Sequence, residues 1–151
     1  MKKLLLLVTV LVLSFSSICF ASDGTNLDAE QKIAASVIDV YYKNGNVEEL
    51  KQYCTADFAK NALNATSISR VKKELDDKFG KVDNIQFAAF ERASFLDANK
   101  KAHPANNVVF AGRGEKNVVV LYNFLFDVSG KKPILINHNI SGRQIQQQEK
   151  K

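Results

Sequence analysis

The spacing of hydrophobic residues changes midway along this chain, and that change constrains the fold more than any other feature of the sequence. Up to Gly80 the apolar residues recur at three- and four-residue intervals, which is the spacing of one face of a helix. From Val82 onward they alternate with polar residues or form short runs, as in strands. Helices followed by strands predict an α+β domain, in which N-terminal helices pack across one face of a curved antiparallel sheet of about four strands.

Capping residues predict where the helices begin. Asp28 opens the first helix, Asn46 the second and Thr55 the third, because side chains of these types accept hydrogen bonds from free backbone N–H groups. Ser67 opens a fourth helix, which ends at Gly80. The apolar stripe of the first helix consists of Ile33, Ala34, Val37, Ile38 and Tyr41.

The spacing of apolar residues in the second half of the chain predicts one long strand followed by a three-stranded meander. In the long strand Phe87 and Phe90 have opposite parity, so a bulge or bend between them is needed to place both on one face. The segment 103–106, which contains Pro104, is interpreted as a loop. The strands are expected at residues 82–96, 108–113, 117–128 and 133–143.

The strand register follows from the lengths of the two hairpin loops, because a slip of one residue moves every side chain to the other face of the sheet. Loops of three residues, over 114–116 and 129–131, give one face that is apolar except at a single place. The expected cross-strand pairs on that face are Tyr122 with His138, Phe124 with Ile136 and, in the first hairpin, Phe110 with Val120.

The first 21 residues have the organisation of a secretory signal peptide. Two lysines precede an apolar run over residues 4–13, and the small residue Ala21 suits cleavage after it. The short, lysine-led leader is typical of bacteria, so we expect an exported, periplasmic or secreted protein. An uncleaved anchor, or a lipoprotein with lipid on Cys19, is the alternative. Residues 22–142 then form a single domain, and the polar residues 143–151 a flexible tail.

Charge and ligand composition argue against several functions. The formal net charge is +5, and two of the lysines belong to the leader, so the remainder is too weakly basic to indicate nucleic acid. After cleavage Cys54 is the only cysteine, which excludes an intrachain disulfide, and no membrane span is expected. Because His103, His138 and Cys54 are scattered, we expect no metal and no cofactor.

Residues 37–54 contain two helical segments joined by the turn Asn44-Gly45-Asn46. This segment resembles the nuclear transport factor 2-like superfamily, whose members form a cystatin-like α+β cone. The resemblance implies an exported bacterial member in which the first helix closes the cone. Enzymes of the superfamily place Asp, His or Tyr side chains inside the cone, but no catalytic motif is matched here and no catalytic residue is carried over. Such a fold does not by itself settle function.

His138 is the candidate centre of a site because it is an ionisable side chain on an otherwise apolar strand face. An unsatisfied buried polar group costs roughly 1–3 kcal/mol, so the imidazole must hydrogen-bond to a ligand or, in an ordinary core, to Tyr122 or a water. We expect a pocket for a small apolar or amphipathic molecule at the mouth of the cone. Its predicted lining is His138, Tyr122, Phe124, Ile136 and Tyr41.

The sequence therefore favours a non-enzymatic binding or accessory protein of the cell envelope. Two alternatives stay open. A small isomerase- or dehydratase-like enzyme would use His138 with a second acid–base group in the same hollow. A protein-interaction module, such as a homodimer, would have a filled core and an outer apolar patch around Leu121 and Leu125.

Overall fold

In the described part of the computed structural model, four helices precede four strands, which confirms the predicted α+β order. The structure describes residues 27–145; the predicted signal peptide, its cleavage site and residues 146–151 of the predicted tail lie outside this range. The helices are α2 (Leu27–Tyr42), α3 (Val47–Lys51), α4 (Ala56–Ala62) and α5 (Ala65–Phe79). The strands are β1 (Val82–Leu96), β2 (Ala102–Gly114), β3 (Val118–Asp127) and β4 (Ile134–Gln144).

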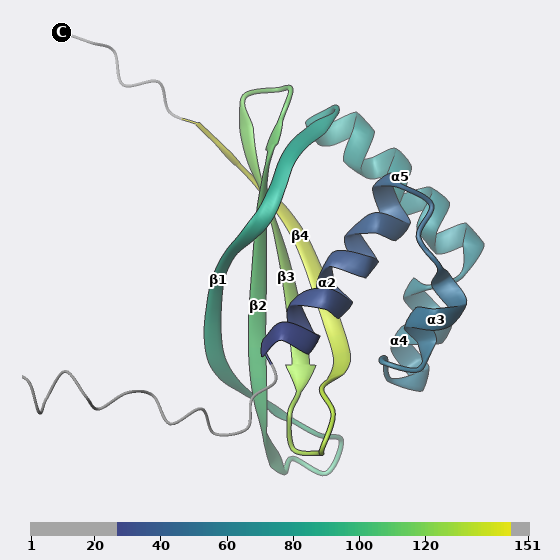
Figure 1. Ribbon diagram of the computed structural model, residues 1–151, viewed down its shortest axis with the longest axis vertical. Coiled ribbons are helices and arrows are strands. Elements are labelled where there is room, and N and C mark those ends of the chain that lie inside the picture. Colours follow the sequence, from purple (N-terminus) through teal and green to yellow (C-terminus); the bar gives the residue numbers. More distant parts are fainter. Residues whose placement is uncertain (1–26, 146–151) are drawn as a thin grey trace, which may run out of the picture.

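The strands form one antiparallel sheet in the order β1-β2-β3-β4. Figure 1 shows that the sheet curves and that all four helices lie on one side of it, with α2 closest to the strands. The inward side chains of β3 are buried, and the outward ones, such as Leu121 and Leu125, are half-buried. Helices on one face of a curved antiparallel sheet are the predicted architecture.

The helix caps follow the predicted chemistry at two of the four starts. The Asn46 side chain accepts a hydrogen bond from the Glu49 backbone N–H, and the Thr55 side chain accepts one from Phe58. The prediction that Ser67 opens the last helix is wrong, because Asn64 accepts from the Ser67 N–H at 2.9 Å and the helix begins before it. Asn64 is therefore the cap.

The core lies between α2 and the concave face of the sheet. The whole predicted stripe of α2 is buried, and so is Glu30 at its N-terminal end. On the sheet side, three large aromatic residues of β3 have no exposed surface, so the space beneath the helices is filled there by side chains. These residues are Tyr122, Phe124 and Phe126.

The predicted irregularity in β1 is present. The pairing of β1 with β2 shifts between Phe87, which lies opposite Phe110, and Ala89, which lies opposite Val109. The shift restores the parity that brings Phe90 opposite the buried Val108. The bend thus follows from the spacing of the two phenylalanines.

The predicted loop at residues 103–106 is wrong, because these residues belong to β2 and pair with β1. The chain reverses earlier, at Asp97, whose Oδ1 accepts hydrogen bonds from the backbone N–H groups of Asn99 and Lys101, both at 2.9 Å. An aspartate that bonds to the backbone ahead of it fixes a turn without a proline. Pro104 lies within the strand.

The predicted strand register is also wrong, by a small shift in each hairpin. Tyr122 lies opposite Ile140, Phe124 opposite His138, and Phe110 opposite Tyr122. In the first hairpin the turn is displaced because Asn117 takes the left-handed backbone, with φ of 55°. In the second, a register irregularity leaves Ile136 with no partner residue in β3.

Candidate functional site

The His138 imidazole on β4 lies in a box of aromatic rings and is hydrogen-bonded to α2. Its Nε2 is 3.0 Å from the Tyr41 hydroxyl oxygen, and the two rings are stacked with centroids 5.9 Å apart. Phe124 lies parallel to the imidazole at 6.3 Å, and Phe58 of α4 meets it edge-on at 5.3 Å. Side chains from α2, α4 and β3 therefore hold this ring in one orientation.

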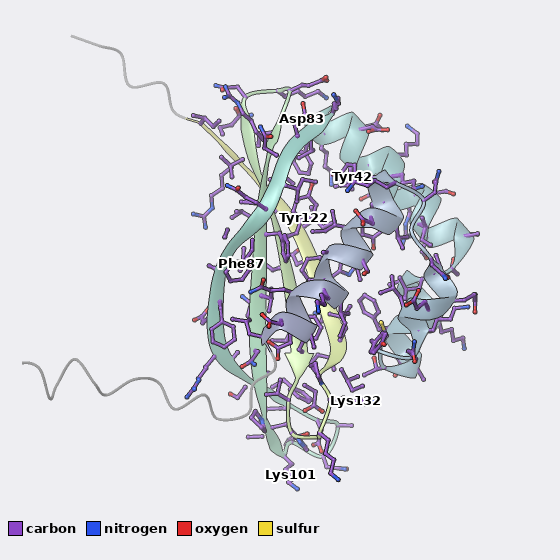
Figure 2. All side chains as sticks on the ribbon, viewed as in Figure 1. Tyr42, Asp83, Phe87, Lys101, Tyr122 and Lys132 are labelled. Atoms are coloured by element: carbon purple, nitrogen blue, oxygen red, sulfur yellow. The ribbon has the colours of Figure 1, made fainter. Side chains whose placement is uncertain are left out.

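Tyr122, the predicted partner of His138, is bonded elsewhere. Its hydroxyl is 2.7 Å from the hydroxyl of Tyr42, and the two rings meet edge-on. Figure 2 shows the two labelled side chains approaching each other between α2 and the sheet. The prediction of a Tyr122–His138 pair is wrong, because the register shift moves Tyr122 opposite Ile140 and α2 supplies a tyrosine to each group.

A cleft of about 360 Å³ opens beside the imidazole, between the helices and the start of β4. Of the predicted lining residues, Tyr41, Ile136 and His138 border this cleft. Phe124 stacks on the imidazole but is fully buried, and Tyr122 does not border it. Sequence reasoning missed the contributions of α4 and α5, among them Asp57, Phe58, Arg70 and Val71.

Burial keeps both members of the Tyr41–His138 pair neutral. Removal from water lowers the pKa of His138 below its ordinary value, because the charged imidazolium loses hydration. Burial also raises the pKa of Tyr41 to about 12, with a smaller contribution from Cys54. At neutral pH the contact is therefore a hydrogen bond between an uncharged phenol and an uncharged imidazole.

The pair uses one imidazole nitrogen and leaves the other without a protein partner in the part of the chain that the structure describes. Within residues 27–145 no carboxylate lies within hydrogen-bond distance of His138, although Asp57 borders the same cleft. A site of this kind can orient a polar group of a bound molecule. It lacks the carboxylate that would hold and polarise a catalytic imidazole.

A second polar pair is buried between α2 and β2. The Asn106 side-chain amide donates to Glu30 Oε1 at 2.8 Å, and Glu30 Oε2 has no partner among the described residues. Burial raises the pKa of the Glu30 carboxyl, and the bond from Asn106 partly opposes that shift. The spacing signals this burial, because Glu30 precedes Ile33 by three residues on the buried stripe.

The remaining chemistry of the described chain is sparse. Residues 27–145 contain no group of three or more His, Cys, Asp or Glu side chains arranged to hold a metal ion. Burial raises the pKa of the Cys54 thiol to about 11, which makes it a poor nucleophile at neutral pH. No helix in the described range is long and apolar enough to cross a membrane.

Comparison with known proteins returns no relative. No family model, no curated protein and no solved structure matches the chain. The fold class and the geometry of the cleft are therefore the basis for any functional assignment.

Proposed function

We propose that this chain is an exported, non-enzymatic binding or accessory protein of the cell envelope that holds a small amphipathic molecule in the His138 cleft. One observation carries the proposal: an imidazole with one nitrogen bonded to Tyr41 and the other without a described protein partner borders a cleft of about 360 Å³. That volume lies within the roughly 300–1,000 Å³ of small-molecule sites.

The tautomer of His138 follows from the state of its partner. Tyr41 stays protonated because its pKa is raised to about 12, so its hydroxyl can donate to Nε2. The imidazole proton then resides on Nδ1, since a neutral imidazole carries one proton. In this arrangement Nδ1 is a fixed donor for a hydrogen-bond acceptor on the ligand.

The lining of the cleft favours an amphipathic ligand. Phe58, Val71 and Ile136 supply apolar surface, whereas Arg70 and Asp57 bring charge to exposed positions along it. A molecule with an apolar body and one acceptor group would place the body against the apolar side chains and the acceptor toward His138. Uniformly polar molecules would leave the apolar lining exposed to water.

The leader and the architecture support the remaining parts of the proposal. A lysine-led apolar segment ending at Ala21 is the basis for export to the periplasm or medium. We also propose membership of the nuclear transport factor 2-like superfamily. The end of α2 at Tyr42, the short turn and α3 from Val47 match the helix–turn–helix order that the resemblance implies.

A double variant tests the cleft without leaving a buried group unpaired. Tyr41→Phe combined with His138→Phe removes both hydrogen-bonding partners and keeps similar ring volumes, so the fold should survive. We expect uptake of the amphipathic probe 8-anilinonaphthalene-1-sulfonate, followed by fluorescence, to weaken at least tenfold. Native mass spectrometry of the unmodified protein from its own cells should also detect a co-purified small molecule.

The matched control is Tyr53→Phe, because Tyr53 borders a separate cleft between α2 and α3. This variant should bind the probe like the unmodified chain. Equal uptake by the double variant and the unmodified chain would remove the proposal.

A homodimer is the second candidate function, favoured by the filled interior of the sheet. The aromatic residues of β3 occupy the space beneath the helices, and Leu121 and Leu125 lie half-buried on the face away from them. If this face pairs, the solution mass should rise from one chain to two with concentration. A Leu121→Lys variant should then stay monomeric, and a constant single-chain mass would exclude pairing.

A further inference from the structure

We propose that one end of the sheet is a docking surface for an anionic lipid bilayer. This end, here named the basic tip, consists of Leu96, Lys100, Lys101, Lys131 and Lys132. It lies on the turns between β1 and β2 and between β3 and β4. The basic tip is separate from the His138 cleft, so this proposal does not rest on the binding function proposed above.

The fold brings the two lysine pairs together from sequence positions about thirty residues apart. The β1–β2 and β3–β4 turns lie at the same end of the sheet, and Figure 2 shows Lys101 and Lys132 at that end. A backbone hydrogen bond from the Val128 N–H to the Pro104 carbonyl, at 3.2 Å, connects the strands that bear the turns. The lysines therefore form one surface.

The four ammonium groups of the basic tip are exposed and have no ion pair or side-chain hydrogen bond with any residue in the range 27–145. The two carboxylates at the same turns, Asp97 and Asp127, already accept hydrogen bonds from nearby residues. Asp97 accepts from two backbone N–H groups and lies 3.1 Å from His103 Nε2, and Asp127 accepts from the Ser129 backbone and hydroxyl.

At the opposite end of the sheet, in contrast, lysines form ion pairs with nearby carboxylates. There Lys81 lies 3.3 Å from Asp83 and Lys78 lies 3.8 Å from Glu74. Figure 2 places Asp83 at that far end. The unpaired positive charge at the basic tip is therefore complementary to an anionic surface outside the protein.

Leu96 distinguishes a membrane from a soluble polyanion as the partner. It is the last residue of β1 and is 67% exposed, although leucine favours burial. An apolar side chain beside lysines can enter the boundary of the acyl chains while the ammonium groups stay at the level of the phosphates. A nucleic acid or a soluble anion offers no such apolar layer.

The expected attachment is weak, reversible and sensitive to salt. A lysine near an anionic membrane surface strengthens binding by roughly fivefold, so four together give roughly several hundredfold. Screening over about 3 Å at 1 M salt should remove most of that gain. The apolar side chain of Leu96 adds to the attraction of the lysines, because binding at a bilayer surface scales with buried apolar area and with attraction to anionic lipids.

Co-sedimentation with vesicles tests the basic tip, using the full chain as recovered from cells that express it. We expect binding to vesicles of 30% phosphatidylglycerol in phosphatidylcholine at 0.1 M salt, and much less to pure phosphatidylcholine. Lys101→Gln with Lys132→Gln should weaken binding roughly 25-fold. Lys100→Gln with Lys131→Gln should do the same, and Leu96→Ser should weaken it roughly fivefold.

The control is Lys78→Gln with Lys81→Gln, which removes the same charge from the opposite end of the sheet and should leave vesicle binding within about twofold. The lysine variants of the basic tip should melt near the unmodified chain, because these lysines make no ion pair or side-chain hydrogen bond with any residue in the range 27–145. The control should do so as well, because exposed ion pairs such as those of Lys78 and Lys81 contribute little to stability. Equal losses in the control and tip variants would overturn the proposal. So would equal binding to pure phosphatidylcholine, or tighter binding to a short DNA duplex with the same dependence on the basic tip.

Discussion

Tyr41 and Tyr42 are neighbours on α2, yet their hydroxyl groups form two different kinds of contact. Tyr42 is half-buried and borders a separate cleft of about 410 Å³, and its hydroxyl lies 2.7 Å from that of the fully buried Tyr122 on β3. Tyr41 bonds to His138 of β4 at 3.0 Å, beside the cleft of about 360 Å³, and the second imidazole nitrogen has no partner in the described part of the chain. The first contact joins two phenols, whereas the second contains an imidazole whose remaining nitrogen has no partner among residues 27–145.

The difference arises from where each strand lies beneath α2. β3 is an inner strand of the sheet, so Tyr122 has no exposed surface. β4 is an edge strand, and His138 is only partly buried because the cleft between α4, α5 and β4 reaches it. The imidazole at the edge strand can therefore gain a further partner, whereas the fully buried Tyr122 hydroxyl cannot.

The largest expected effect is a difference in unfolding free energy between alanine variants at Tyr122 and His138, because the two side chains are packed to different extents. Tyr122→Ala should lower the free energy of unfolding by about 3–5 kcal/mol, because it opens a cavity in a fully buried region. His138→Ala should cost roughly 1 kcal/mol, since the half-buried ring can be replaced by water. Urea denaturation of both variants measures the contrast, and similar costs would show that the His138 region is as closed as the core.

Local signals explain which parts of the fold could be predicted from the sequence. The helix stripe and the caps at Asn46 and Thr55 depend on residues within four positions of each other, and they were predicted correctly. The strand register depends on the backbone of Asn117 and on the irregularity at Ile136. Both arise where strands, turns and helices must fit together, and sequence spacing does not report that fit.

The candidate site was predictable to a similar extent. Tyr41 and His138 were expected to share a lining and they touch, because each has a clear position on the buried side of its element. The partner of Tyr122 was missed because it depends on the register. The burial of Glu30 can be predicted from its spacing along α2. Its hydrogen bond to Asn106 cannot, because residues 103–106 resemble a loop in the sequence.

An alkaline titration sharpens the comparison by ionising the phenols. The folded pKa of Tyr41 is raised to about 12 from 10, so the stability it contributes is fully present below pH 10 and is lost as pH rises toward 12. A two-unit shift corresponds to about 3 kcal/mol. The raised pKa values of Tyr42 and Tyr122 act in the same direction.

Tyr41→Phe should therefore flatten the fall in unfolding free energy between pH 10 and 12 without abolishing it. Tyr42→Phe with Tyr122→Phe should flatten the fall further, and the dependence that remains includes the Cys54 thiol, whose raised pKa of about 11 acts in the same direction. Chemical denaturation at intervals of half a pH unit measures both slopes. An unchanged slope in Tyr41→Phe would mean that solvent reaches the Tyr41 hydroxyl and that the pair is more open than the structure indicates.

The smallest expected effect lies on the acid side and concerns His138 alone. Its folded pKa is lowered by burial, so the stability it contributes is present above the unfolded value of 6.5 and is lost as pH falls through the folded pKa. Glu30 acts in the opposite sense, because its raised pKa makes its contribution decline as pH rises. The measurement is therefore made in a Glu30→Gln background, where this opposing titration is absent.

In that background the free energy of unfolding should fall as pH is lowered below 6.5, and His138→Phe should remove this dependence. The chain has two histidines, so the His138 signal in NMR of the imidazole protons is assigned as the one that His138→Phe removes. Binding of the anionic probe should raise the His138 pKa, because a sulfonate that accepts from Nδ1 stabilises the charged imidazolium. In the absence of the probe, a His138 resonance that titrates at or above 6.5 would contradict the burial of the imidazole.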